Sequence, residues 1–413
     1  MRITKLESFT VAIPFRAPIL SAFGVSYPAR IRTFVRVFTD EGYVGIGETG
    51  PGALNYVNRD ALLSRFEKYI APAIIGESPY DFNWIRRKLF HTVDAVAVEI
   101  ACWDIIAQKS GVPLYRLLGG QGYVEDVSVA GYCFFRAAAR DGTGEVTPAN
   151  FVEHCIDVQK SSNFSVLKIK LGANRPEVEV ALVADLRAAL NEQVAIRVDP
   201  NGSWSLSTAL RMLKRLEPLD LEYIEEPVRT QGPADGTTAT AMLRRLRSIS
   251  RTPIAADHSY RVDLLAQIVR DDAADLVLAD VFGSGGIEAT MGFCRVASAF
   301  GLGVALHSGT ELCVGQVVKT HIQAALPDMI NFAGDAIYPE YVDGVLMGGK
   351  LRIEDGKMKV PQSPGLGIEL DENKLAEWEL TAAVHSELDA FWDEVKARTH
   401  VDYPSADMLM QHY

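Results

Sequence analysis

The chain has 413 residues, of which 48% are hydrophobic, and a formal net charge of -12. This length exceeds one ordinary core, so we expect a large domain and a smaller one. The negative charge argues against nucleic acids and anionic membranes as partners, because both are bound through basic surfaces. A small anionic substrate remains compatible, since a few cations or a bound metal can reverse the field inside one cleft.

The five cysteines are widely spaced and form no C-x-x-C pair, so the sequence predicts neither a disulfide framework nor a zinc site. We expect them to be small buried hydrophobic residues. The first ten residues lack the apolar core of a secretory signal, and no window approaches the length of a membrane span. A cytoplasmic location is the resulting prediction.

The first part of the chain has the pattern of a sheet followed by helices. Apolar residues alternate over 3–13, and 32–39 and 43–48 flank a glycine-containing turn, which predicts a strand and a hairpin. From 61 to 119 the apolar spacing becomes helical. We therefore predict a separate α+β capping domain over 1–125.

Eight short apolar runs then follow, each ending in polar residues and each followed by a helical stretch. The runs are 127–133, 166–170, 195–199, 222–225, 254–257, 276–280, 303–307 and 329–332. Successive polar ends lie 23 to 32 residues apart, the length of one strand–helix unit. The pattern predicts an α/β fold of the (β/α)8 type, a modified TIM barrel, over 126–355. The last segment, 356–413, carries a helical stretch over 372–398, and we expect it to pack on the capping domain.

Three successive predicted strands end in the carboxylates Asp199, Glu225 and Asp257. The carboxyl ends of barrel strands converge on one opening, where three oxygen ligands suit one Mg²⁺ ion. Neither His nor Cys joins the trio, which disfavours zinc. Any one of these residues could instead cap the following helix, but three in succession favour a metal site.

Two candidate bases flank this trio. Lys168 and Lys170 end the second predicted strand and alternate to the same face, where each would lower the pKa of the other. Asp280 and His307 end the sixth and seventh, so the aspartate would orient the imidazole and hold its tautomer. A K-x-K pair is more often a solvated surface pair, and a lone histidine is often only structural. Their position at the strand ends favours the catalytic interpretation.

In the order of these residues the chain resembles the enolase superfamily. Muconate-lactonizing relatives carry a lysine where this chain has Asp280, whereas mandelate racemase and glucarate dehydratase relatives carry the Asp–His pair. Several stretches look most like glucarate dehydratases, namely 131–134, 199–205, 360–361 with 364–367, and 406–408 with 410–411. The resemblance implies a Lys or His base working with Mg²⁺. It also implies substrate contacts from Tyr132 and Phe134, and we expect further contacts from Asn201, Ser308 and Glu311.

The chain also departs from the glucarate dehydratase pattern. Those enzymes place an asparagine where this chain has Asp257, and their substrate-binding arginine has no counterpart near Pro404. His307 is followed by Ser308-Gly309-Thr310 in place of an asparagine-rich run. The sequence therefore does not single out glucarate as the substrate.

The resemblance implies a Mg²⁺-dependent acid-sugar dehydratase, a hydro-lyase that removes the α-proton of a small carboxylate substrate and expels the β-hydroxyl. Racemisation or epimerisation of a 2-hydroxy acid uses the same enediolate, and a non-catalytic binding protein is a more remote alternative. We expect a homo-oligomer whose segments 19–24 and 408–413 close over the site. The acid sugar, its stereochemistry and the number of subunits stay open.

Overall fold

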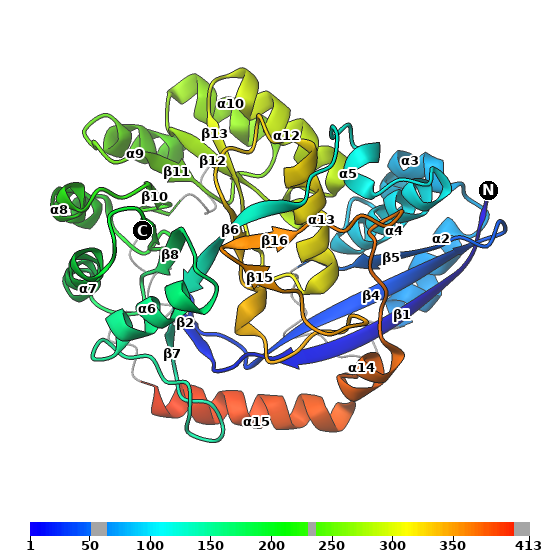
Figure 1. Cartoon of the computed structure of the whole chain (residues 1–413), viewed down its shortest axis with the longest axis horizontal. Helices are drawn as coiled ribbons and strands as arrows, with labels where there is room; N and C mark the ends of the chain where they lie inside the picture. Colours follow the sequence, from blue (N-terminus) through cyan, green and yellow to red (C-terminus); the bar gives the residue numbers. More distant parts are fainter. Residues whose placement is uncertain (51–63, 230–236, 400–413) are drawn as a thin grey trace.

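The structure, a computed structural model, describes residues 1–50, 64–229 and 237–399. A small antiparallel sheet with its helices forms one part of the molecule, and a barrel of parallel strands forms the other (Figure 1). A long helix near the carboxyl end runs along the lower edge of the molecule in this view. The predicted architecture, a (β/α) barrel with a capping domain, is confirmed.

The capping domain is built on strands β1 (Ile3–Pro14), β4 (Ala29–Thr39) and β5 (Val44–Glu48), which pair antiparallel in that order. Helix α4 (Val93–Lys109) packs on β4 and β5. A Cβ atom at Gly47 would lie 1.9 Å from the carbonyl oxygen of Ala97 in this helix. Glycine is therefore required where the strand and the helix approach each other.

Short elements complete this domain. They are η2 (Phe66–Ile70), α2 (Ala71–Ile74), η3 (Pro79–Asp81), α3 (Phe82–Lys88) and α5 (Leu114–Leu117). Ile70, Ile74 and Ile85 from these elements form one buried cluster with Val35 and Val37 of β4. The predicted helical region is thus confirmed for its described part, 64–119.

Eight parallel strands form the barrel, with the helices around them (Figure 1). The strands are β6 (Asp126–Cys133), β8 (Val166–Lys170), β9 (Ala195–Asp199), β10 (Tyr223–Glu225), β11 (Ile254–Ala256), β12 (Leu276–Ala279), β13 (Gly303–Leu306) and β14 (Gly334–Ala336). Strands β6 to β13 pair in chain order, and β14 pairs with β6 and lies beside β13. The helices are α6 (Phe151–Ser161), α7 (Pro176–Ala189), α8 (Leu206–Leu216), η4 (Glu217–Leu219), α9 (Thr237–Arg247), α10 (Val262–Asp271), α11 (Val281–Ser284), α12 (Ile287–Ala299), α13 (Cys313–Ala325) and η5 (Tyr338–Glu340).

The eighth strand differs from the prediction. The run 329–332 is not a strand, and β14 begins two residues after it. Phe332 instead packs edge-on against Tyr223 at 5.7 Å, and Asn331 Oδ1 accepts a hydrogen bond from the Val304 amide. The apolar character of this run therefore reflects packing at the end of the barrel rather than strand pairing.

Buried carboxylates of the capping domain join it to the barrel. Glu48, at the end of β5, accepts hydrogen bonds from the amides of Leu312 (2.6 Å) and Gly315 (2.8 Å) at the start of α13. Glu99 of α4 accepts one from the Glu288 amide (3.1 Å) at the start of α12. The first amides of a helix lack partners within the helix and carry partial positive charge, so a carboxylate stabilises them.

The segment after the barrel strands contributes to both parts. A hairpin of β15 (Ile353–Glu354) and β16 (Lys357–Lys359) extends the barrel sheet, because β16 pairs antiparallel with β6. The predicted helix 372–398 is divided into α14 (Glu372–Glu377) and α15 (Ala382–Arg398). The division occurs because the Leu380 amide bonds to the Thr10 carbonyl oxygen and Thr381 caps the second helix.

Helix α15 packs on the capping domain. Its residues Val384, Leu388 and Trp392 lie against the buried cluster that includes Tyr27 and Ile31. The predicted closing segment 19–24 forms a short hairpin of β2 (Ile19–Ser21) and β3 (Gly24–Val25), and β2 pairs with β7 (Phe135–Arg136) next to β6. The other predicted closing segment, 408–413, lies outside the described residues.

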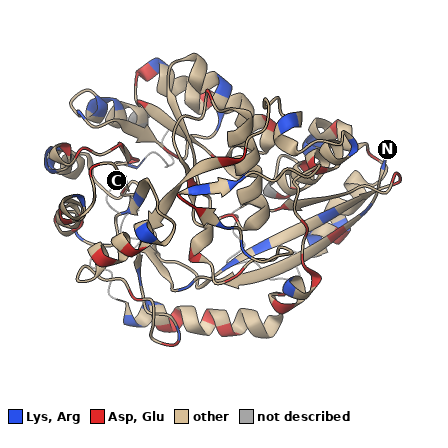
Figure 2. Cartoon of the chain, in the orientation of Figure 1, with Lys and Arg blue, Asp and Glu red and all other residues tan. Residues whose placement is uncertain are grey.

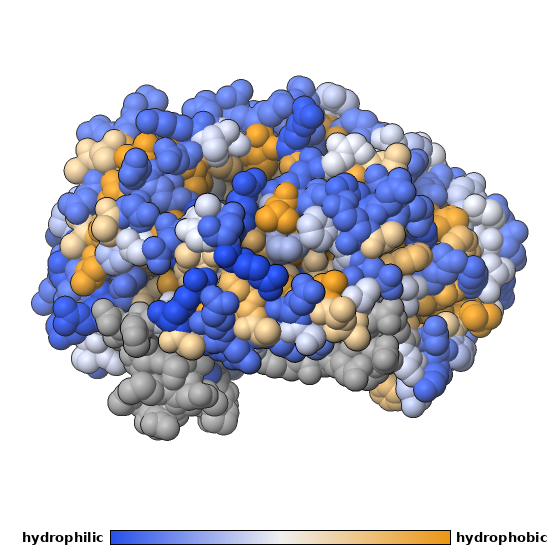
Figure 3. Space-filling model, turned by 90° about the horizontal axis from the view of Figure 1, so that it is seen from below, coloured by the Kyte–Doolittle hydropathy of each residue, from blue (hydrophilic) through white to orange (hydrophobic). Residues whose placement is uncertain are grey.

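The remaining surface and composition features are ordinary. All five cysteines are buried and free of disulfides, as expected. Lys and Arg are interspersed with Asp and Glu over the ribbon (Figure 2), and on the face of Figure 3 hydrophobic residues form small groups among hydrophilic ones. Within the described parts of the chain, no helix has both the length and the hydropathy needed to cross a membrane.

Candidate active site

The polar ends of neighbouring barrel strands converge as the sequence predicts. Lys168 and Lys170 end β8, and Lys170 pairs in register with Asp199 of β9. Glu225 ends β10, and Asp257 directly follows β11. All five side chains are buried, because alternation along each strand turns them into the barrel.

Ion pairs link the lysines to the carboxylates. Lys168 Nζ lies 2.5 Å from Glu225 Oε2 and 2.6 Å from Asp335 Oδ2, and Lys170 Nζ lies 2.5 Å from Asp199 Oδ2. Burial alone would lower the pKa of Lys168, but the charges of Asp335 and Glu225 outweigh it and raise that pKa well above its ordinary value. The expected lowering of the lysine pKa is therefore wrong for Lys168, which stays a fixed cation because its neighbours include carboxylates.

The carboxylates crowd one another. Burial, followed by the charge of Asp199, raises the pKa of Glu225 well above its usual range. Burial would also raise the pKa of Asp199, but the ammonium groups of Lys170 and Lys168 outweigh it and hold that pKa below its ordinary value. Such a concentration of buried negative charge favours a cation.

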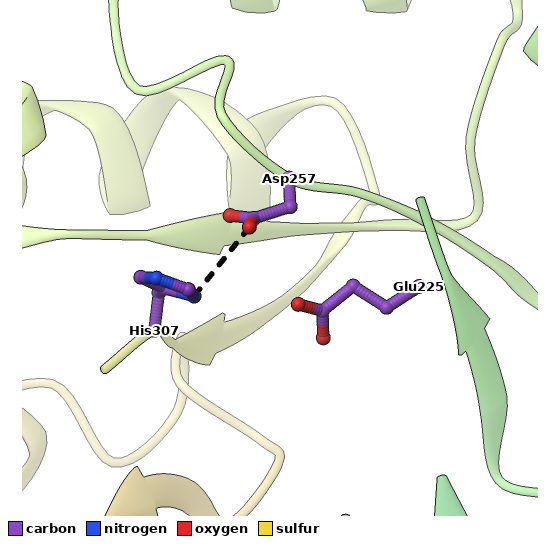
Figure 4. A group of neighbouring side chains, drawn as sticks. All are labelled: Glu225, Asp257 and His307. Carbon is purple, nitrogen blue, oxygen red and sulfur yellow. Dashed lines mark ion pairs between the residues drawn. The ribbon is translucent and has the colours of Figure 1, made fainter. Parts of the chain in front are cut away.

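Neighbouring side chains form a place where a cation could bind. Figure 4 shows the side chains of Glu225, Asp257 and His307 directed toward one another, and one potential ligand atom from each lies within 4.8 Å of the others. Asp199 lies beside them, and its Oδ1 accepts a hydrogen bond from the Asn201 amide (2.8 Å). Glu225 and Asp257 supply carboxylate oxygens to this group, the ligand type that a hard divalent ion such as Mg²⁺ prefers, and its third member is His307 rather than the predicted ligand Asp199.

His307 follows β13 and is buried. Its Nδ1 lies 3.5 Å from Asp257 Oδ2, the contact dashed in Figure 4, and has no hydrogen-bond partner among the residues that the structure describes. Burial lowers the pKa of His307 to about 3, opposed in part by the charge of Asp257. The imidazole is therefore neutral near pH 7 and can accept a proton.

The predicted hydrogen bond between Asp280 and His307 is absent from this structure. Asp280 caps α11 instead, and its Oδ1 accepts a hydrogen bond from the Gly283 amide. The reason is local, because β12 ends at Ala279 and the chain turns directly into α11. Burial raises the pKa of Asp280 to about 7. Both residues nevertheless line the same cavity.

This cavity, of about 650 Å³, lies between the strand ends and the capping domain. Lys170 and His307 line it from the barrel, Phe15 and Arg30 from the capping domain, and Trp392 from α15. The hairpin β2–β3 also lines it, since Ile19, Ser21 and Gly24 belong to the wall. The proton-transfer candidates therefore face a space that two parts of the chain enclose.

Four of the five predicted substrate contacts line the cavity, namely Tyr132, Phe134, Asn201 and Ser308. Glu311 does not line it. Its buried carboxylate pairs with Lys319 Nζ at 2.6 Å and accepts a hydrogen bond from Ser308 Oγ at 3.0 Å. Glu311 is thus held by Lys319 of α13, and Ser308, which does line the cavity, lies between Glu311 and that space.

Sequence reasoning missed Asp335 and the loop after β11. Asp335 lies in β14, accepts a hydrogen bond from Tyr132 Oη (2.9 Å) and pairs with Lys168. The spacing signal was present, since Asp335 follows His307 by 28 residues, one strand–helix unit. His258 and Tyr260 also line the cavity, and Tyr260 Oη donates to Asp257 Oδ1 at 2.7 Å. They lie beyond the strand, where apolar alternation gives no signal.

Comparison with known families agrees with this arrangement. The mandelate racemase/muconate lactonizing enzyme N-terminal domain matches residues 3–119, and the enolase C-terminal domain-like family matches residues 150–374, more than half of the chain. The chain belongs to the enolase superfamily. The resemblance inferred from the strand-end residues is thereby confirmed.

Relatives of this enolase-superfamily chain carry out different reactions. A curated relative from Streptomyces coelicolor, named "Probable glucarate dehydratase", is 30% identical and aligns over 87% of each chain. An N-succinyl-L-Arg/Lys racemase of Bacillus cereus is 28% identical over 91% of this chain and 98% of its own. Members of the superfamily are enzymes, but these names include both a dehydratase and a racemase.

Solved relatives share the whole fold. An enolase of Pseudomonas fluorescens, solved with magnesium, potassium and tartrate, is 27% identical and superposes with a TM-score of 0.81. The alignment covers 100% of this chain and 96% of that one. Magnesium and a small carboxylate are thus both present in a structural relative.

Proposed function

We propose that this protein is a Mg²⁺-dependent dehydratase of acid sugars, a hydro-lyase. The observation that carries the proposal is the presence of Lys170 and His307 on one cavity, from strands β8 and β13. Four strands separate β8 from β13 in the sheet, so the two groups approach a substrate from different sides of the barrel. Elimination of water needs a base for the α-proton and an acid for the leaving hydroxyl, and these two groups can serve in those roles.

One divalent ion is proposed to bind at Asp199, Glu225 and Asp257. When bound, Mg²⁺ supplies positive charge that holds the substrate carboxylate and stabilises the negative charge developing on its oxygens. Lys168 supplies a second, permanent charge at the same place, because its carboxylate neighbours keep it protonated. Stabilisation of developing charge by fixed groups is usually the largest catalytic contribution.

The neutral imidazole of His307 and the ion pair of Lys170 with Asp199 favour one direction of proton flow. His307 is neutral and removes the α-proton, leaving an enediolate on the substrate. Lys170, whose Nζ lies 2.5 Å from Asp199 Oδ2, gives a proton to the β-hydroxyl, so the C–O bond breaks and water leaves. The resulting enol becomes a 2-keto-3-deoxy acid. For a substrate of opposite configuration at the α-carbon, Lys170 would be the base.

Racemisation or epimerisation of a 2-hydroxy acid is the second candidate. The same two residues could remove a proton from one side and return it to the other, and the Bacillus cereus relative is a racemase. The tartrate held by the Pseudomonas fluorescens relative is itself a 2-hydroxy acid. We favour dehydration because a dehydratase stands among the relatives at 30% identity.

The test is a screen of mono- and diacid sugars with Mg²⁺, in which loss of water, keto-acid formation and exchange of the α-proton with deuterated solvent are measured. A dehydratase gives a keto acid and loses the mass of water. Exchange or inversion without loss of water on every acid would identify a racemase or epimerase. Absence of both on a broad panel would revive the binding-protein alternative. Light scattering would test the proposed homo-oligomer.

A further inference from the structure

Arg30 and Arg32 differ in how their guanidinium groups are used. They lie two residues apart on β4, so both side chains leave the same face of the strand. Arg32 donates to the carbonyl oxygens of Gly309 (3.2 Å) and Thr310 (2.7 Å) and lies 3.6 Å from Glu48 Oε1. These bonds fix the loop after β13 to the capping domain.

Arg30 makes no comparable contacts. Among the described residues its guanidinium has no ion pair or hydrogen bond, and its Nε is buried without a partner. The guanidinium carbon lies 5.5 Å from the centroid of the Phe15 ring, which packs on Tyr341 at 4.9 Å. This cation–π contact orients the side chain but provides no anion.

The surroundings of Arg30 suggest where an anion would come from. Arg30 lines the 650 Å³ cavity together with Lys170, His307 and Ser308. Along the described wall of this cavity the only acidic residue is Asp280, whose carboxylate already caps α11. A partly buried cation without a partner is costly, so a ligand that supplies an anion to it gains affinity.

The proposed function already places one carboxylate of the substrate in another part of the cavity. Under the proposed function the α-carboxylate lies at the strand ends, near Lys168, where the barrel supplies its charges. Arg30 belongs to the capping domain, which closes the cavity from the other part of the chain. A molecule that satisfies both places carries two anionic groups.

We propose that Arg30 binds the distal carboxylate of the substrate, which makes the preferred substrates diacid sugars (aldarates) rather than monoacid sugars (aldonates). This inference rests on the proposed function and names its substrate class. Arg30 is then a residue of specificity, and it has no part in proton transfer.

The experiment compares Arg30→Met with Arg36→Met on matched acids. Arg36 is on the same strand but pairs with Glu372, away from the cavity, so its loss controls for removal of a β4 cation. Each aldarate is paired with the aldonate of the same configuration, which ends in a hydroxymethyl group. We expect Arg30→Met to lower kcat/KM for the aldarate by about 30-fold or more, chiefly through KM. For the aldonate we expect both variants to stay close to the wild type, and Arg30→Lys to restore part of the loss.

Several outcomes would overturn the inference while leaving the dehydratase proposal intact. They are a wild-type preference for aldonates, or an equal loss with both acids in Arg30→Met. Should that variant not fold, the wild-type ratio of kcat/KM for each aldarate and its aldonate decides. Calorimetry of glucarate and gluconate binding to the Mg²⁺-loaded protein separates the two proposals. Arg30-dependent preference for glucarate without any turnover would support the subsite and contradict the dehydratase.

Discussion

At the scale of single residues, the two lysines of β8 act as built-in counterions for the buried carboxylates. Lys168 contacts Glu225 and Asp335, and Lys170 contacts Asp199. Negative charge at the strand ends is therefore compensated in part by the chain itself. This differs from small metal domains, in which the ion is needed for folding.

We accordingly predict that removal of metal abolishes turnover but not the fold. Exhaustive chelation should leave the far-ultraviolet circular dichroism spectrum unchanged and lower the free energy of unfolding only by the linkage contribution. That contribution is about 2.7 kcal/mol when free Mg²⁺ is 100 times its Kd. Turnover that survives chelation, or an unfolded metal-free protein, would contradict the prediction.

Substitution of the proposed ligands should act mainly on metal affinity. Asp199→Asn and Glu225→Gln each remove a charge that attracts the ion, so we expect Mg²⁺ affinity to fall by more than the roughly 10–100-fold that loss of an outer-shell partner costs. Asp257→Asn should be mildest, because glucarate dehydratase-like relatives have an amide there. Isothermal titration calorimetry measures each change. Unaltered affinity in all three variants would remove these residues from the metal site.

The two candidate bases should act on substrates of opposite configuration at the α-carbon. From the family resemblance we expect Lys170 to serve α-protons of S configuration and His307 those of R configuration. Lys170→Ala and His307→Asn should each lower exchange from one configuration by roughly 10²–10⁴-fold and spare the other. Solvent-deuterium exchange followed by NMR gives the result. Full exchange of both configurations in His307→Asn would exclude His307 as a base.

Asp280→Asn should be much milder than His307→Asn. Asp280 makes no hydrogen bond to the imidazole, and an asparagine oxygen can still accept the Gly283 amide that caps α11. We expect exchange rates within about tenfold of the wild type, below the 10²–10⁴-fold assigned to a general base. A loss equal to that of His307→Asn would indicate that the two residues act as one unit.

At the scale of elements, Glu179 fixes the loop that follows Lys170. Its fully buried carboxylate, from α7, accepts hydrogen bonds from the amides of Gly172 (2.7 Å), Ala173 (2.9 Å) and Asn174 (2.8 Å). The loop that leads away from the base is thus anchored to the helix of its own strand–helix unit. In the sequence Glu179 resembles a solvated residue on a helix surface.

We predict that Glu179→Ala destabilises the protein by about 3 kcal/mol or more, because it leaves buried amides without acceptors. It should also lower kcat through displacement of Lys170. Glu179→Gln retains one acceptor oxygen, so its stability and kcat should lie between those of the wild type and those of Glu179→Ala. Urea unfolding and steady-state kinetics measure both effects. Unchanged stability in Glu179→Ala would show that the loop finds other acceptors.

The strands that the sequence predicts well are those in which apolar runs end in a polar residue. Buried parallel strands need such runs, so seven of the eight predicted runs coincide with strands to within one residue at each end. The eighth failed because Phe332 is apolar for packing, whereas β14 itself carries the buried charge of Asp335. The same principle placed Lys168, Asp199 and Glu225, whose positions depend on register.

Contacts set by loops could not be predicted in this way. The Asp280–His307 hydrogen bond was expected because their strands are adjacent. The Asp280 carboxylate instead accepts a hydrogen bond from the Gly283 amide of α11. Glu311 was expected to contact substrate and is instead paired with Lys319 on α13. Such choices depend on which buried partner lies nearest, and sequence spacing carries no information on that.

At the scale of the whole molecule, the stability contributed by the contact between the capping domain and the barrel should depend on pH. Burial raises the pKa of Glu48 and of Glu99 to about 7, although nearby arginines and backbone amides oppose it. Between about pH 4.5 and pH 7 the folded protein therefore holds protons that the unfolded chain has released. The stability from these groups is fully present below the unfolded pKa and is lost as pH rises through 7.

We predict that the free energy of unfolding falls between pH 5 and pH 8, and that Glu48→Gln and Glu99→Gln each flatten this slope. Urea titrations at several pH values measure it, with Glu354→Gln as a control because Glu354 is an exposed residue of β15. Slopes identical to the wild type in both interface variants would exclude these carboxylates as the source.

The way in which Glu48 and Glu99 join the domains has an evolutionary consequence. Both bind main-chain amides at the starts of barrel helices, and every residue except proline offers such an amide. Side chains on the barrel can therefore diverge without loss of the docking contact. Arg30 and the hairpin β2–β3 lie on the docked domain, whereas Lys170 and His307 lie on the barrel. Mutation and recombination can thus exchange the proposed recognition residues while the proposed proton-transfer residues are inherited unchanged.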